Sequence, residues 1–115
     1  MSINLKIKRR ASLIKKILVE IVNNLINNEQ IGYISLTYVN LSNDLSFCTV
    51  FYTILNDENA NLSLVSELLE KNKEKIRKKL AENISNMKRI PVLIFEYDKS
   101  FLYGKNIDKI LDTMK

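Results

Sequence analysis

The sequence predicts an α+β fold in two layers, with a three-stranded sheet covered by helices. Two long segments carry apolar residues at the i, i+3, i+4 spacing of an amphipathic helix. Three shorter segments are rich in β-branched and aromatic residues, which is typical of strands. The chain has 115 residues, of which 46% are hydrophobic, so we expect one compact domain over residues 1–115.

The first predicted element is an amphipathic helix over residues 8–28. Its apolar positions fall on one face: Ala11, Ile14, Ile17, Leu18, Ile21, Val22 and Leu25. At about 100° per residue, four cations fall on the far side: Lys8, Arg9, Lys15 and Lys16. Asparagine is a weak helix former, so the Asn-rich end of this segment is expected to fray before Gly32.

Two strands are expected next, over residues 33–41 and 45–54. The residues between them, 40–44, read Asn-Leu-Ser-Asn-Asp, and such polar residues favour tight turns. The strands should therefore pair as an antiparallel hairpin. Five aromatic side chains are expected to pack in the core or across the strands, with base stacking as the alternative: Tyr33, Tyr38, Phe47, Phe51 and Tyr52.

Helical periodicity returns over residues 62–88, after a polar loop, and Asn61 is the predicted N-cap. The apolar positions include Val65, Leu69, Ile76 and Leu80. The polar run 70–75 interrupts the segment, so we expect two helices that meet near Asn72.

A third strand is predicted over residues 91–97, with Pro91 at its start, where proline is tolerated. Residues 98–100 have turn chemistry, and a short final helix is expected over residues 105–114.

Composition excludes several classes of function. The chain has no His, which rules out His-based acid–base catalysis, Ser-His-Asp triads and His-containing metal sites. One Cys and two Gly exclude an internal disulfide, a Cys-only zinc site and a Gly-rich phosphate loop. No apolar run is long enough for a membrane helix. We therefore expect a soluble, cytoplasmic protein that is not an enzyme and uses no cofactor, metal, small-molecule substrate or membrane.

Three carboxylates and one thiol are the remaining candidates for chemistry. Asp57 and Glu58 fall in a polar loop and Asp98 follows a strand, so surface and turn roles are expected rather than catalysis or Mg²⁺ binding. Cys48 falls in mid-strand, which predicts a small buried side chain rather than a reactive thiol.

The net charge is +5, and charge is segregated along the chain. Residues 1–16 carry six cations and no acid, residues 17–70 carry seven acids and no cation, and residues 71–89 carry eight cations against two acids. An A/T-rich genome would raise the Lys content, but codon bias does not explain so long a stretch without one basic residue. The segregation predicts a one-sided positive field and a polyanionic partner.

Two segments carry a family resemblance. Residues 40–52 read NLSNDLSFCTVFY, and residues 89–100 read RIPVLIFEYDKS, followed by Gly104, Ile107 and Leu111. They resemble the patterns V-x-L-S-x-D-L-x-x-A-x-V-Y and R-x-P-x-L-x-F-x-x-D-x-S-x-x-x-G-x-x-I-x-x-L of the bacterial ribosome-binding factor A family. The chain departs from that family at residues 72–74, where Asn-Lys-Glu replaces Ala-x-Gly, and at Cys48, where the family has Ala.

The resemblance implies a type II KH-like fold, ordered α-β-β-α-kink-α-β with a short C-terminal helix. It also implies an assembly factor that binds 16S rRNA and the free or immature 30S subunit during late maturation and 5′-end processing. We expect a monomer. The sequence has no G-x-x-G loop, so docking on the shape and phosphates of folded rRNA is expected. A generic nucleic-acid-binding module and a basic protein-interaction domain are the alternatives.

The predicted RNA contacts belong to the two basic segments, which we expect to fold side by side into one cation-rich surface. They are Lys8, Arg9, Arg10, Lys15, Lys16, Lys71, Lys73, Arg77, Lys78, Lys88 and Arg89. The arginines are favoured among them because a guanidinium pairs bidentately with phosphate.

Overall fold

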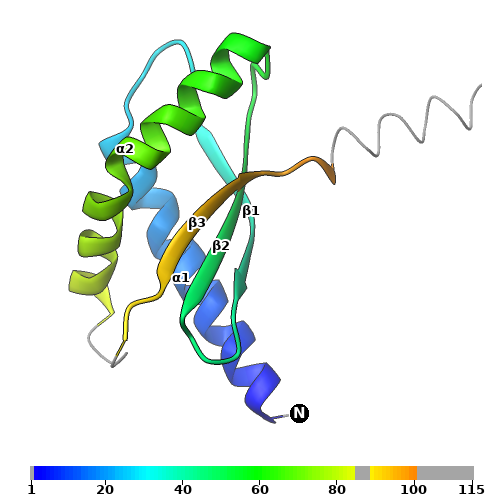
Figure 1. The fold of residues 1–115 in the computed structure, drawn as a ribbon, viewed down its shortest axis with the longest axis vertical. Coiled ribbons are helices and arrows are strands. Elements are labelled where there is room, and N and C mark those ends of the chain that lie inside the picture. Colours follow the sequence, from blue (N-terminus) through cyan, green and yellow to red (C-terminus); the bar gives the residue numbers. More distant parts are fainter. Residues whose placement is uncertain (1, 85–88, 101–115) are drawn as a thin grey trace, which may run out of the picture.

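The computed structural model describes residues 2–84 and 89–100, and their fold is the predicted α+β class. The element order is α1 (Ser2–Leu25), β1 (Ile34–Leu41), β2 (Phe47–Ile54), α2 (Asn59–Asn83) and β3 (Val92–Tyr97) (Figure 1). Two sequence predictions, the helix over 105–114 and the contact at Lys88, lie outside the described residues.

The three strands form one sheet in the order β1-β2-β3. As predicted, β1 and β2 form an antiparallel hairpin, in a register that runs from Ile34 opposite Ile54 to Leu41 opposite Cys48. β3 joins the other side of β2 and runs parallel to it. A parallel pair needs a long crossover connection, and α2 supplies it (Figure 1).

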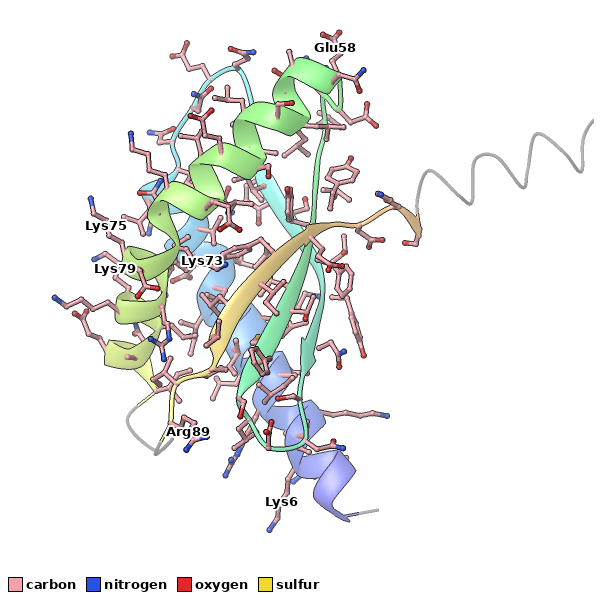
Figure 2. All side chains as sticks on the ribbon, in the orientation of Figure 1. Lys6, Glu58, Lys73, Lys75, Lys79 and Arg89 are labelled. Atoms are coloured by element: carbon pink, nitrogen blue, oxygen red, sulfur yellow. The ribbon has the colours of Figure 1, made fainter. Side chains whose placement is uncertain are left out.

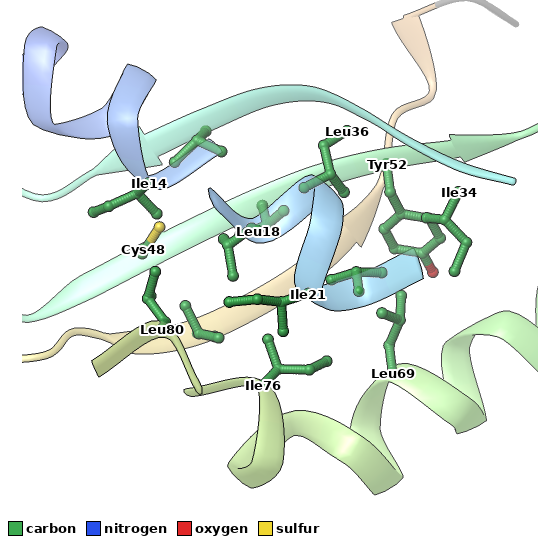
Figure 3. Packing of buried hydrophobic residues seen from close by; sticks show 14 of the residues in the cluster. Ile14, Leu18, Ile21, Ile34, Leu36, Cys48, Tyr52, Leu69, Ile76 and Leu80 are labelled. Atoms are coloured by element: carbon green, nitrogen blue, oxygen red, sulfur yellow. The ribbon is translucent and has the colours of Figure 1, made fainter. Parts of the chain in front are cut away.

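Both helices cover the same face of the sheet. Alternate residues of β2 are buried on that face, and they join one hydrophobic cluster with residues of α1 and α2 (Figure 3). On the other face, Phe47 is 51% exposed and Val92 is 44% exposed. The described helices therefore cover one side of the sheet, and the described part of the chain has two layers.

The hairpin turn is held by side-chain hydrogen bonds. The Asp44 carboxylate accepts from the Ser42 hydroxyl at 2.8 Å and from the Ser46 backbone N–H at 3.1 Å. These hydrogen bonds lower the pKa of Asp44, and the bond from the Ser42 hydroxyl has the largest effect. Leu45 adopts a positive φ of 63°. The turn therefore takes up Leu45 and Ser46, and β2 begins at Phe47 rather than at residue 45.

α1 differs from its predicted bounds at both ends. It begins at Ser2, and it ends at Leu25 rather than at residue 28. The side chain of Asn28 accepts hydrogen bonds from the N–H groups of Gln30 and Ile31. Such local side-chain bonding competes with the helix for backbone donors, which accounts for the early end.

The predicted break near Asn72 is wrong, because α2 is one continuous helix from Asn59 to Asn83. Its axis changes direction near the middle (Figure 1). There the Asn72 side chain donates to the Leu68 carbonyl at 2.8 Å, a bond to the preceding turn that competes for a helical acceptor. Among the described residues, only Leu45 and Gly32 have a positive φ, so Asn72 makes no left-handed kink.

The predicted N-cap at Asn61 is also wrong. Glu58 occupies that position without a side-chain capping bond, and Asn61 lies inside the helix with 3% of its surface exposed. The Asn61 side chain donates to the Asn56 carbonyl and accepts from the Gln30 side chain. It therefore ties the start of α2 to the loop that follows α1.

Candidate RNA-binding surface

Most cations of α1 are exposed. Ala11, Ile14 and Leu18 face the core, and the exposed cations are Lys6, Lys8, Arg9, Arg10 and Lys16. The predicted position on the far side is wrong for Lys8 and Lys15, which line a hollow beside β1 together with Ala11. Lys15 is half-buried, because its ammonium group reaches the Thr37 carbonyl on β1 at 3.4 Å.

The second half of α2 carries the other group of cations. Ile76 and Leu80 are fully buried, and the exposed cations around them are Lys71, Lys75, Lys78 and Lys79. Lys75 and Lys79 are exposed as well, although they are not among the predicted contacts. Lys73 is half-buried and lies 3.3 Å from the Glu70 carboxylate.

Arg77 has a structural role that the sequence pattern does not indicate. Its Nε donates to the Pro91 carbonyl at 3.2 Å, and its Nη2 donates to the Ile90 carbonyl at 2.9 Å. A guanidinium has five N–H donors, and two of these fasten α2 to the residues just before β3. Phosphate binding by Arg77 stays a prediction.

Replacing Arg77 with alanine is expected to lower the free energy of unfolding by about 2 kcal/mol, since a hydrogen bond from a charged donor contributes roughly 1.5–3 kcal/mol. Lys78→Ala is the matched control on the same helix, and its effect should stay within about 0.5 kcal/mol because Lys78 is exposed. Urea unfolding checks both variants. Equal losses would contradict the anchoring role of Arg77.

The two basic segments lie on helices that cover the same face of the sheet. In Figure 1, α1 rises from the lower end and α2 descends from the upper end, so the second half of α2 reaches from the middle of the molecule towards the end where α1 begins. Figure 2 shows Lys6 and Arg89 at this end and Glu58 at the other, while Lys75 and Lys79 project from the outer side of α2. We call the cations of residues 6–16 and 71–79, with Arg89, the basic surface.

Direct pairing with an acidic side chain involves one described cation of the basic surface, Lys73. Within residues 5–84 and 89–100, the Lys73–Glu70 contact is the one ion pair. Exposed pairs of this kind contribute little. The described cations of α1 thus keep their charge available to an external anion.

Asp98 has the turn role expected of it. Asp98 accepts from the backbone N–H of Ser100 at 2.9 Å and from the hydroxyls of Ser100 and Thr37. These hydrogen bonds lower the pKa of Asp98, and the bond from the Ser100 hydroxyl has the largest effect.

In the part of the chain that the structure describes, no three His, Cys, Asp or Glu side chains gather as a metal site would require. No described helix is long and apolar enough to span a bilayer.

Cys48 is fully buried, as predicted, and its burial raises the pKa of the thiol to about 12. The thiolate is the reactive form of cysteine, so Cys48 should not react with a thiol reagent at pH 8 in the native protein. It should react fully after unfolding in urea. With a reagent that releases a coloured thiolate, absorbance measures the reaction rate of Cys48 in the folded and in the unfolded protein. Rapid reaction of the folded protein would contradict the buried position.

Three of the five hairpin aromatics lie outside the core, but Tyr38 makes an expected cross-strand contact with Phe51. Tyr52 is buried, and its ring meets that of Tyr97 edge-on, with 5.6 Å between centroids. Tyr33, Tyr38 and Phe47 are more than half exposed. A shift in the β1–β2 register between Leu36 and Tyr38 changes the alternation of faces, which a regular pattern does not foresee.

Comparisons with known proteins identify the family. The family model described as Ribosome-binding factor A matches residues 6–111. A ribosome-binding factor A of Phytoplasma mali is 52% identical over 104 residues, which is 90% of this chain and 91% of that protein. The chain belongs to the ribosome-binding factor A family. A family member from Staphylococcus saprophyticus is 33% identical over 96% of both chains.

Solved structures of the ribosome-binding factor A family share the fold. The crystal structure from Thermus thermophilus superposes with a TM-score of 0.66 at 22% identity, covering 79% of this chain and 93% of that one. A Thermus thermophilus model fitted into a cryo-EM map of a 30S–RbfA complex gives a TM-score of 0.66 at 21% identity, with coverage of 78% and 92%.

Proposed function

We propose that this chain is a non-enzymatic, monomeric assembly factor that binds the free or immature 30S subunit through the phosphates of 16S rRNA. It acts during late maturation and 5′-end processing, in the cytoplasm. Family membership supports ribosome binding, and one relative of the same fold has been fitted into a 30S complex. The assignment of the fold to the KH-like type II class is part of this proposal.

One observation supports the proposal: two basic segments, more than fifty residues apart in sequence, present exposed cations on α1 and on the second half of α2, two helices that pack on the same face of the sheet. Lys and Arg contacts to phosphates release counterions, which gives strong and sequence-tolerant affinity. Binding free energy can then bias the conformation of the rRNA without any bond being made or broken.

Co-sedimentation with purified ribosomal particles tests the proposal. The protein should pellet with free 30S subunits, and an excess of random single-stranded oligonucleotides should not displace it. Equal competition by random oligonucleotides would favour a generic nucleic-acid binder. Pelleting only in the presence of another protein would favour a basic protein-interaction domain.

A further inference from the structure

A hollow lies between α1 and the outer edge of the sheet. It has a volume of about 350 Å³ and is lined by Lys8, Ala11, Ser12, Lys15, Tyr38 and Val39. A second hollow of about 190 Å³ shares four of these residues and continues along β1 toward the hairpin turn. Together they form a groove between α1 and β1, which we call the α1–β1 groove.

Tyr38 lines the α1–β1 groove at the edge strand, and its exposed ring lies beside Phe51, a residue that points to the sheet face away from the helices. Tyr38 is 59% exposed, although it stands in a strand beside the core. Its ring packs against that of Phe51, with 6.1 Å between centroids and 42° between planes. Phe51 therefore supports one side of the ring and limits its movement, which lowers the entropy lost when a flat ligand stacks on it.

Lys8 and Lys15 supply positive charge to the same groove. Lys8 is exposed, and the Lys15 ammonium is held over the β1 edge by the Thr37 carbonyl at 3.4 Å. The groove is continuous with the basic surface, because both lysines belong to it. A ligand that suits this site carries anionic groups for the lysines and a flat ring for the tyrosine.

We propose that the α1–β1 groove binds an unpaired nucleotide of an RNA strand. Lys8 and Lys15 contact its phosphates, and its base stacks on Tyr38. Base-paired RNA does not fit, because the faces of its bases are already stacked inside the helix. This inference rests on the proposed function and deepens it: the basic surface supplies sequence-tolerant affinity, and the groove selects a site where the RNA is single-stranded.

The test uses the full chain and a short single-stranded oligouridine RNA that carries one 2-aminopurine. Tyr38→Leu should weaken binding about tenfold, as expected for the loss of one base–aromatic stack. Tyr38→Phe should restore the affinity, because the ring remains. Tyr33→Leu is the matched control, since Tyr33 is 62% exposed and lines a different hollow without a lysine.

Two further readouts separate stacking from charge. The fluorescence of 2-aminopurine should fall on binding to the wild type and should fall less with Tyr38→Leu. Replacing Lys8 and Lys15 with Gln should reduce the slope of log K against log salt by about 1.4, near 0.7 for each contact to a single strand, whereas Tyr38→Leu should leave the slope unchanged.

The inference is overturned if Tyr38→Leu binds the oligonucleotide as tightly as the wild type, or if Tyr33→Leu weakens binding equally. It is also overturned if a matched RNA duplex binds with the same loss in Tyr38→Leu. The proposed function fails separately, through loss of wild-type association with 30S subunits, so the two failures are distinguishable.

Discussion

Replacing Leu18 with alanine is expected to lower the free energy of unfolding by about 3 to 5 kcal/mol. Leu18 is fully buried and lies in the middle of the cluster formed by α1, α2 and the sheet (Figure 3). Truncation removes its contacts with both layers and leaves a cavity that a packed interior fills only partly. Because domains of this size are stable by about 5–15 kcal/mol, the loss is a large share of the total.

Urea unfolding followed by circular dichroism measures the effect of Leu18→Ala. Leu13→Ala is the matched control, because Leu13 lies on the same helix but is 51% exposed. Its loss should stay below about 1 kcal/mol. Similar losses for the two variants would show that the buried face of α1 does not hold the two layers together.

Reversing three cations of α1, by Arg9→Glu, Arg10→Glu and Lys16→Glu, is expected to weaken association with 30S subunits at least about a hundredfold at moderate salt. The change removes three contacts and adds repulsion from the RNA phosphates. All three side chains are exposed, so stability should change little. Co-sedimentation measures binding, and thermal unfolding confirms the fold.

The matched control for the charge reversal lies elsewhere on the surface. Lys99 is exposed and follows β3, apart from the basic surface, so Lys99→Glu should change binding only slightly. Undiminished 30S binding by the triple variant would contradict a role for α1. If the triple variant kept its RNA binding and lost a protein partner, the interaction-domain alternative would gain support.

The elements that periodicity predicts well are those in which one face is buried. The apolar stripe of α1 and the alternation along β2 are both present in the structure, because burial imposes the period of each element on its sequence. The hairpin follows from the turn residues around Asp44. The parallel pairing of β3 depends on the path of the chain in space, which local patterns do not contain.

The positions that sequence patterns predict poorly are those where one side chain overrides a regular pattern. Asn72 bonds to the preceding turn and α2 continues through it, although a polar run there resembles a break. Tyr38 turns outward beside a shift in register. Arg77 is a predicted phosphate contact, but two of its N–H donors bond to backbone carbonyls that are distant in sequence. Each outcome depends on a tertiary contact.

The central claim is that the cations gathered by α1 and α2 bind rRNA phosphates. The most direct test is the affinity of the full chain for free 30S subunits, measured over a range of monovalent salt. For about five or six phosphate contacts, log K should fall with log salt with a slope of roughly −4 to −5. Affinity that does not change with salt, or no binding to the free subunit even at low salt, would contradict the claim.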